Sequence, residues 1–315
     1  MHPEPKSCVA WNDPELGEFM AALSRGAPGA PCRKIGAYDE SFVRKAIVKR
    51  MQAHGLPQVA NYGEYVAGHP EEIEELSRSL RIGYSEFFRN PCTFAMLEQW
   101  IVPSLAAAQK FRGRGELRVW SAGCAAGQEA WSIAMLLDAM SEAGEPRLAY
   151  RIFATDLAEP DLALAEAGVY SAEAVGNVRL SYLNAYFVRQ GECFVVAPRL
   201  RERVSFSVYD LLDGGSSSPE ASLYGDFDLI FCCNLLFYYR PDVRQRILGK
   251  IGRALAPGGY VVTGEAERDM VAAHDGLHAV APPVTVFHKT CNPRSGRCSM
   301  NPLPPAIFHD ARKTL

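Results

Sequence analysis

The sequence has no run of about 18 or more apolar residues, the length that a membrane-spanning helix needs. Its first residues, MHPEPKSCVAWNDPELGEF, lack a basic segment followed by an apolar one, so they do not predict a signal peptide. Strong charge of one sign is also missing, because the formal net charge is −3 over 315 residues. We therefore expect a cytoplasmic protein without membrane insertion, and the overall charge does not favour a nucleic-acid partner.

Metal-ligand spacing is missing as well. The nine cysteines form no C-x-x-C pair and the seven histidines are scattered, so we predict no metal site. Several cysteines lie in apolar runs, as buried thiols do, whereas Cys291 and Cys298 have a spacing that allows a disulfide or metal ligation. With 48% hydrophobic and 22% charged residues, the composition is that of a globular protein long enough for two domains.

Proline, glycine and hydrophobic periodicity divide the chain. Residues 1–35 form a proline-rich arm with one short helix, and residues 36–107 are predicted to form a domain of four helices. Residues 108–115 are basic and glycine-containing, as a linker is. Residues 116–290 alternate strands and helices, which predicts a doubly wound α/β domain. Residues 291–315 lose all periodicity and read as an irregular tail.

The α/β part is predicted in more detail from its apolar runs. We expect strands at 117–121, 149–155, 204–209, 227–232 and 259–264, and helices at 128–143, 160–167 and 242–255. The run Phe227–Cys233 is almost wholly apolar, as a parallel strand covered on both faces must be. Two short β-rich runs around Gly191 predict an inserted β subdomain over residues 186–203.

The stretch Val119–Ile133 runs from an apolar strand through a glycine-containing turn into a helix, which is typical of a nucleotide-binding corner. Gly123 and Gly127 allow a sharp turn and a close backbone approach to a ligand, or they serve the turn alone. Their spacing is not that of the dinucleotide-binding fingerprint. Glu129 follows in the first turn of the helix.

In an open α/β sheet the ligand binds beyond the carboxyl ends of the strands. The second strand ends at Asp156, a carboxylate placed to accept hydrogen bonds from a ribose diol. It lies 33 residues after Gly123, further than in a dinucleotide-binding fold, so a related cofactor is favoured over NAD.

Two further strand ends carry groups that suit a nucleoside. Asp210 is placed to accept a hydrogen bond from an exocyclic amine, and Leu211 to pack on an aromatic base. After the fourth strand, the polar Asn234 is followed by Leu235 and further apolar and aromatic residues, which would line one side of the site. Glu267, after the fifth, is expected to cap a loop and not to enter the site.

These residues resemble one family, the S-adenosylmethionine-dependent methyltransferases of the chemotaxis-receptor (CheR) type, which form glutamate methyl esters on receptor signalling helices. The similarity spans about Ser41 to Lys289 and is carried by Ser85–Pro91 (SEFFRNP), Trp120–Glu129 (WSAGCAAGQE) with Ser132–Leu137 (SIAMLL), Phe153–Asp156 (FATD), Ala167–Tyr170 (AGVY), Phe227–Cys232 (FDLIFC), Asn234 with Tyr238, and Gly258–Gly264 (GGYVVTG) with Glu267. The resemblance implies a class I methyltransferase fold and S-adenosylmethionine as cofactor, with S-adenosylhomocysteine as product.

The resemblance also implies roles for particular residues. The cofactor would be surrounded by Ser85, Arg89, Glu129, Asp156, Asp210 and Leu211. Arg89 and Tyr238 would border the reactive methyl group, although Arg89 also fits a surface cation beside two phenylalanines. Of the neighbours Tyr238 and Tyr239, one is expected to be a core aromatic, and we predict that it is Tyr239.

The chain departs from the family where Arg commonly precedes the Asn of the fourth strand end, because Cys233 stands there. A thiol cannot replace a charged fork that positions a carboxylate. Three hypotheses therefore remain: a protein-glutamate methyltransferase, a methyltransferase acting on another protein or a small molecule, and a relative that binds the cofactor without transfer.

A basic helix is expected over Phe42–Gln52. Its cations Arg44, Lys45, Lys49 and Arg50 form either a solvated face or, as the resemblance implies, a docking face for an acidic helical protein such as a chemoreceptor signalling domain. We expect the protein to act as a monomer.

Overall fold

The computed structural model describes residues 14–24, 35–81, 83–112, 115–143, 148–216, 218–219, 222, 225–282 and 284–289. The predicted irregular tail, with Cys291 and Cys298, and most of the predicted arm lie outside these residues. The chain divides into two compact units, which we call the helical unit (Met1–Gly83 with Leu235–Arg246) and the sheet unit (Tyr84–Asn234 with Ile247–Leu315).

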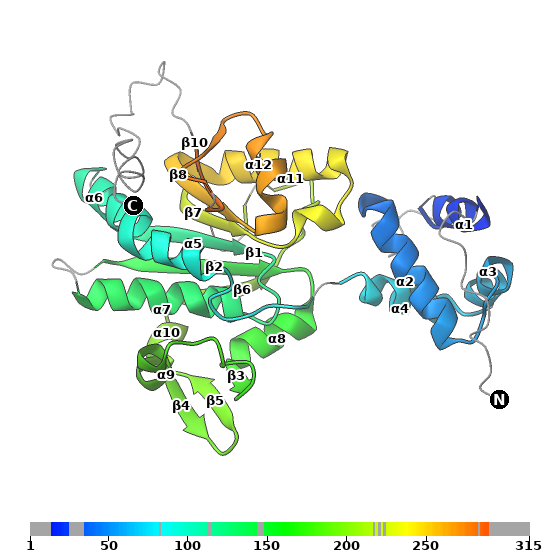
Figure 1. Ribbon diagram of the computed structural model, residues 1–315, viewed down its shortest axis with the longest axis horizontal. Coiled ribbons are helices and arrows are strands. Elements are labelled where there is room, and N and C mark those ends of the chain that lie inside the picture. Colours follow the sequence, from blue (N-terminus) through cyan, green and yellow to red (C-terminus); the bar gives the residue numbers. More distant parts are fainter. Residues whose placement is uncertain are drawn as a thin grey trace, which may run out of the picture. The chain divides into compact units, whose positions relative to one another are not determined.

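The helical unit contains α1 (Pro14–Ser24), α2 (Glu40–Ala53), α3 (Val59–Gly68) and α4 (Pro70–Ser79), close to the ranges that the sequence predicts (Figure 1). Their apolar faces meet in one cluster that includes the fully buried Ile47, Met51 and Tyr62. Helix α2 begins where it does because Asp39 caps it, accepting hydrogen bonds from the Ser41 amide at 3.0 Å and the Ser41 hydroxyl at 2.6 Å.

The helical unit also takes in a segment from far along the chain. This segment contains the 3-10 turn η3 (Leu236–Tyr238) and the first residues of α11 (Pro241–Ala254). It pairs with the residues before α2, since the amide of Asp39 donates to the carbonyl of Tyr238 at 2.8 Å and the amide of Arg240 to that of Ala37 at 3.0 Å.

The sheet unit is built on seven strands in the order β6-β2-β1-β7-β8-β10-β9. The five strands predicted from the sequence are β1 (Leu117–Ala122), β2 (Tyr150–Asp156), β6 (Val204–Val208), β7 (Phe227–Cys232) and β8 (Leu255–Thr263), and they are parallel. Two strands were not predicted, β9 (Leu277–Ala279) and β10 (Val286–Lys289), which add an antiparallel edge. The fold is the predicted doubly wound α/β class.

Helices flank this sheet (Figure 1): α7 (Gln128–Ala143) and α8 (Glu159–Ala167) pack on β2 and β6, and η4 (Glu265–Glu267) and α12 (Arg268–Ala272) follow β8. Strand β7 is buried at every position, and Val119 of β1 and Ile152 of β2 are fully buried as well. This apolar layer fixes the strand ends that carry the candidate site.

The division of the chain differs from the predicted one at residue 107. The predicted fourth helix consists of α5 (Pro91–Met96), the π-helical turn η2 (Leu97–Ile101) and α6 (Val102–Arg112), and it belongs to the sheet unit. Phe94, Leu97 and Leu105 are buried in the core of that unit, which explains the difference. Helix α6 also runs through the first part of the predicted linker, 108–115.

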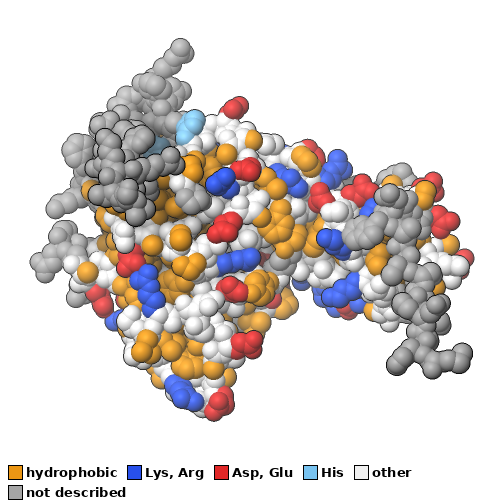
Figure 2. Space-filling view, in the orientation of Figure 1, with side chains coloured by type: hydrophobic (Ala, Val, Ile, Leu, Met, Phe, Trp, Pro, Cys, Tyr) orange, Lys and Arg blue, Asp and Glu red, His pale blue; other side chains and the backbone are white. Residues whose placement is uncertain are grey.

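The predicted inserted subdomain is larger than a hairpin. Strands β4 (Phe187–Gln190) and β5 (Cys193–Val196) turn at Gly191, whose φ is 60°, and β3 (Val169–Ser171) adds a third antiparallel strand against β5. Helices α9 (Leu180–Tyr186) and α10 (Pro198–Arg201) complete it. The side chains over the end of the hairpin are of both charges (Figure 2).

Candidate cofactor site

The carboxyl ends of β2, β1, β7 and β8 lie next to one another in the sheet. The loop after β1 contains Gly123 and Gly127, with φ of 82° and 88°, so the predicted sharp turn is present. It is tied to β2 because the amides of Gly123 and Cys124 both donate to the carbonyl of Thr155, at 2.8 and 2.9 Å. The backbone at Gly127 packs closely against α8. A Cβ at this position would lie 2.7 Å from the Cβ of Ala165, so a larger residue would clash.

Asp156, at the end of β2, is half-buried and braces the same loop. Its two carboxylate oxygens accept from the amides of Ala125 and Ala158, each at 2.9 Å. Ala125 has a left-handed backbone with φ of 46°, which this bond helps to hold. A carboxylate has about four lone-pair sites, so these two bonds are compatible with further bonds to a ligand hydroxyl.

Glu129 lies in the first turn of α7, half-buried. Burial raises the pKa of its carboxyl to about 7, while hydrogen bonds from Ser121 and Cys233 and the charge of Arg89 act in the opposite direction. The Ser121 hydroxyl donates to Glu129 at 2.6 Å. An enclosed carboxyl of this kind gains most from a ligand that brings its own positive charge.

Cys233 follows β7, and its thiol forms a hydrogen bond with the Glu129 carboxyl but brings no charge to it. Its sulfur lies 3.6 Å from the carbonyl oxygen of Val262. Burial raises the pKa of the thiol well above its usual value, and the negative charge of Glu129 raises it further. The thiol therefore stays neutral and does not compensate the charge of Glu129.

Arg89 and Ser85 lie in the segment before α5, and both are half-buried. The guanidinium of Arg89 is 5.5 Å from the ring centroid of Tyr84. The two residues that flank Arg89, Phe88 and Asn90, have left-handed backbones with φ of 51° and 62°. The charge of Arg89 lowers the pKa of Glu129, and the place of Arg89 beside a cofactor stays a prediction.

The end of β6 carries the two residues predicted to meet an adenine. Asp210 accepts from the amide of Leu212 at 2.8 Å, and Leu211 is buried. The amide of Tyr209 donates to the carbonyl of Asp156 at 3.0 Å, which joins this strand end to the previous one. Lys250 supports the turn by donating to the carbonyl of Asp213.

Asn234 follows Cys233 and has a φ of 57°. Its amide donates to Glu267 at 2.7 Å, and the same carboxylate oxygen accepts from the Thr263 hydroxyl and the Gly264 amide, each at 2.9 Å. Glu267 is fully buried. As predicted, this carboxylate caps a loop and holds the ends of β7 and β8 together.

Two of the predicted residues, Leu235 and Tyr238, belong to the helical unit. The Tyr238 ring lies 4.7 Å from that of Phe42, and Tyr239 stacks on Tyr38 at 5.0 Å. Tyr239 is buried and Tyr238 is half-buried, which confirms that Tyr239 is the core aromatic. The place of Leu235 and Tyr238 beside a cofactor stays a prediction.

The four candidate docking cations of α2 separate into two pairs. Arg44 and Arg50 are half-buried and bound within the unit, to Glu40 at 2.7 Å and to Glu72 at 2.7 Å. Lys45 and Lys49 are exposed and one helical turn apart. On the face that Figure 2 shows, the cations of this unit lie among acidic side chains.

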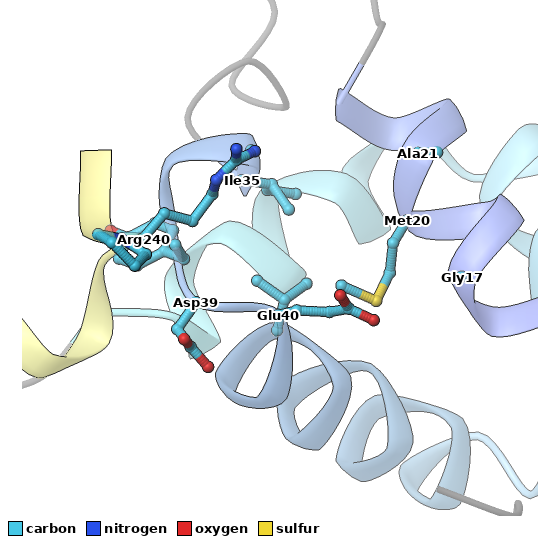
Figure 3. Close-up of a pocket in the computed structure, with 11 residues that line it drawn as sticks. Gly17, Met20, Ala21, Ile35, Asp39, Glu40 and Arg240 are labelled. Carbon is cyan, nitrogen blue, oxygen red and sulfur yellow. The ribbon is translucent and has the colours of Figure 1, made fainter. Parts of the chain in front are cut away.

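The helical unit also contains a pocket of about 630 Å³ (Figure 3). Met20 and Glu40 point into the region between α1 and α2, and Asp39 and Arg240 lie on its other side. Its carboxylates are already bound within the unit, Asp39 to Ser41 and Glu40 to Arg44. The cofactor-like features are those of the strand ends.

Two absences hold for the part of the chain that the structure describes. None of its helices has both the length and the apolar character needed to cross a bilayer. None of its histidine, cysteine and acidic side chains gather in a group of three that could hold a metal ion.

Sequence reasoning missed two hydroxyls in the sheet unit, those of Ser121 and Ser132. Ser121 binds Glu129, and Ser132 accepts from the amide of Phe88 at 2.9 Å. Both are fully buried. The available signal was a lone hydroxyl within an apolar strand or helix, which needs a partner when buried.

Counted along its own seven strands, the sheet has the order 3-2-1-4-5-7-6 with the seventh strand antiparallel, and acidic groups stand at successive strand ends. This is the fold expected from the resemblance, that of the class I S-adenosylmethionine-dependent methyltransferases. Residues 84–281 match the model of the family described as "CheR methyltransferase, SAM binding domain", and the chain belongs to this family. S-adenosylmethionine is accordingly its cofactor.

Three relatives illustrate the similarity. An uncharacterized 104.1 kDa protein of Rhodobacter capsulatus is 32% identical over 73% of this chain, which spans only 23% of that relative. Chemotaxis protein methyltransferase 1 of Pseudomonas aeruginosa is 31% identical over 74% of this chain and 84% of its own length. Probable biofilm formation methyltransferase WspC of the same species is 28% identical over 94% of this chain and 66% of its own length.

Proposed function

We propose that this protein transfers the methyl group of S-adenosylmethionine to glutamate carboxylates of an acidic helical protein, such as a chemoreceptor signalling domain. The observation that carries the proposal is the enclosed carboxyl of Glu129 among the joined ends of β1, β2 and β7, in a chain similar to a chemotaxis methyltransferase.

The residues of the sheet unit fit the cofactor. Glu129 has the raised pKa of a buried carboxyl and suits an ammonium group. Asp156 keeps acceptor capacity for ribose hydroxyls, and Asp210 and Leu211 offer an acceptor and an apolar surface for adenine. Ser85, Gly123, Gly127 and Asn234 would complete the wall of the site.

The cofactor supplies a methyl group on a positively charged sulfur, which a carboxylate attacks directly. Because the acceptor is already a nucleophile, the protein has little proton transfer to perform, and alignment provides most of the acceleration. We assign this alignment to Arg89 and Tyr238. Arg89 is a guanidinium, which suits an acceptor carboxylate.

We further propose that Lys45 and Lys49 form the part of α2 that an acidic helix meets. Both are exposed on one face, whereas Arg44 and Arg50 are half-buried. Changing both lysines to glutamate should raise KM for an acidic substrate and reverse its dependence on salt, because salt then screens a repulsion. Arg78→Glu, on α4 of the same unit and also exposed, is the matched control and should leave KM unchanged.

The test is transfer from labelled S-adenosylmethionine into a purified chemoreceptor signalling fragment. Label that mild base releases as methanol identifies a carboxyl methyl ester and supports the proposal. Base-stable label would point to another acceptor, and binding of the cofactor without transfer would point to a non-catalytic relative. Either of the last two results contradicts glutamate methylation.

Asp156→Ala tests the cofactor site separately. It should abolish measurable binding of S-adenosylmethionine in calorimetry, because both a ligand acceptor and the brace of the loop are lost. Asp138→Ala, on α7 and bound to Tyr150, is the control and should bind normally. An unchanged affinity of the Asp156 variant would remove this assignment.

A further inference from the structure

The turn that carries Arg89 is strained. Phe88 and Asn90, on either side of Arg89, have φ of 51° and 62°, a region that bulky side chains rarely adopt. Such a backbone persists only where its surroundings hold it, and strained residues cluster at functional sites.

Side-chain packing holds part of this turn. Phe87 meets Tyr170 edge-on at 4.9 Å and Phe88 meets Phe94 at 5.1 Å, and both phenylalanines are buried. Asn90 begins α5, with its carbonyl accepting from the amide of Thr93 at 2.9 Å. These contacts fix where the turn lies, but packed rings do not fix the direction of a peptide plane.

One polar contact does fix it. The amide of Phe88 donates to the hydroxyl oxygen of Ser132 at 2.9 Å, and that hydroxyl donates in turn to the carbonyl of Gln128 at 2.7 Å. Ser132 is fully buried. Its hydroxyl is therefore oriented by the helix and presents a lone pair to the amide of Phe88, the residue before Arg89.

Ser132 also lies three residues after Glu129 on α7, one helical turn along. One turn of α7 thus carries both the Glu129 carboxyl and the Ser132 hydroxyl, and the hydroxyl holds the segment that bears Arg89. Arg89 is the positive charge that lowers the pKa of Glu129.

We propose that Ser132 is a positioning residue that acts through Arg89. Its bond to the Phe88 amide keeps the strained turn in the conformation that directs the guanidinium toward Glu129 and the cofactor. This inference rests on the proposed role of Arg89 in cofactor binding.

The experiment is a double-mutant cycle on binding of S-adenosylhomocysteine, measured by calorimetry on the full chain. Ser132→Ala should weaken binding about tenfold in the natural background, the scale expected for a lost contact to a charged group. In the Arg89→Met background the same change should alter binding less than about twofold, because the residue through which Ser132 acts is gone. Equal effects in both backgrounds would overturn the proposal, since a general structural role is additive.

Ser222→Ala is the matched control, because this serine is equally buried in the sheet unit and its hydroxyl binds Arg118. It should leave binding unchanged in both backgrounds. If Ser132→Ala does not fold, Ser132→Cys, similar in size but a weaker acceptor, gives the same cycle.

The outcomes separate this inference from the proposed function. Tight binding with an additive Ser132 effect overturns the positioning role and leaves the cofactor site intact. If Arg89→Met alone has no effect, both Arg89 as a cofactor ligand and the role of Ser132 are wrong. A natural protein that binds no S-adenosylhomocysteine contradicts the proposed function itself.

Discussion

The hydroxyl of Ser121 donates a 2.6 Å hydrogen bond to Glu129, joining the carboxyl end of β1 to the first turn of α7. Among its neighbours this bond lowers the pKa of Glu129 most, yet it does not offset burial, which raises that pKa to about 7. The charge state of this carboxyl therefore changes within the physiological pH range, and this has consequences for ligand binding.

Cofactor affinity should rise with pH. A ligand that brings an ammonium group to Glu129 favours the ionised form, so below about pH 7 a proton must first leave. Affinity for S-adenosylhomocysteine should be about tenfold lower at pH 6 than at pH 8, by linkage to one group. Calorimetry between pH 6 and pH 8 measures this change in affinity. Glu129→Gln should bind weakly, and its affinity should not depend on pH. A flat profile for the natural protein would show that Glu129 does not titrate with binding.

The unliganded protein should respond in the opposite sense. The folded pKa of Glu129 lies above its ordinary value of 4.5, so ionisation opposes folding. Stability without ligand should fall as pH rises from about 5 to about 8, by about 2 to 3 kcal/mol for this group alone. Urea unfolding of the natural protein compared with Glu129→Gln at both pH values isolates the contribution. An equal pH dependence in the two proteins would contradict it.

Cys233→Arg should remove both dependences. A guanidinium at this position would place a permanent cation beside Glu129, which the neutral thiol does not. The pKa of Glu129 should then fall toward its ordinary range, and S-adenosylhomocysteine affinity should become constant between pH 6 and 8. Cys233→Ser, which adds no charge, serves as the control and should keep the natural profile. If the serine variant loses the dependence too, the thiol acts through something other than its lack of charge.

Glu72 should be the main acid-sensitive group of the helical unit. It is buried, and although burial alone would raise its pKa, hydrogen bonds from Arg50, Tyr62 and His54 lower it to about 2. A carboxyl whose pKa falls from 4.5 to about 2 on folding contributes about 3 kcal/mol at neutral pH, and this is lost as pH falls from about 4.5 to about 2.

Glu72→Gln should therefore destabilise the protein by about 2 to 3 kcal/mol at pH 7. The free energy of unfolding, measured with urea and circular dichroism, should also fall less in the variant as pH is lowered from about 4.5 to about 2. Glu75→Gln, which removes a more exposed partner of Arg78, should change stability by less than about 0.5 kcal/mol. Similar losses in the two variants would mean that the buried network of Glu72 contributes no more than a surface ion pair.

The parallel strands were predictable because runs such as Phe227–Cys232 are apolar on both faces. The edge strands β9 and β10 were not, since three or four residues carry too little pattern. Nor does helical periodicity say which core a helix packs on, so the segment after residue 91 was placed in the wrong unit.

The candidate site shows the same limit. Asp156 was found at the end of its strand and Glu129 in the helix turn that follows another, whereas the bond between Ser132 and Phe88 joins residues 44 apart in the chain. The bond of Arg50 to Glu72 likewise spans 22 residues, so the sequence offered only a solvated face or a docking face for this cation, and neither alternative included its buried partner. Short-range pattern identifies strand ends, and only the fold identifies what meets there.

Arg244 fastens the turn that carries Tyr238. Its guanidinium donates to the carbonyls of Leu236, Tyr239 and Phe237 at 3.1, 2.6 and 3.3 Å. It also lies 3.8 Å from Asp39, the residue that caps α2. A single half-buried side chain thus binds two carbonyls of η3 and the one that follows it, and links them to the start of the helix that bears Lys45 and Lys49.

Arg244→Met should loosen this turn and lower kcat for methyl transfer about tenfold or more, because Tyr238 loses its fixed position, while the Kd for S-adenosylhomocysteine stays within about twofold. Steady-state kinetics with calorimetry on the same preparation separates the two quantities. Arg240→Met is the matched control, since Arg240 is exposed and binds only Asp242 through its guanidinium among the described contacts, and its kcat should be natural. A loss of cofactor affinity equal to the loss of kcat would show that Arg244 supports the whole fold and not the position of Tyr238.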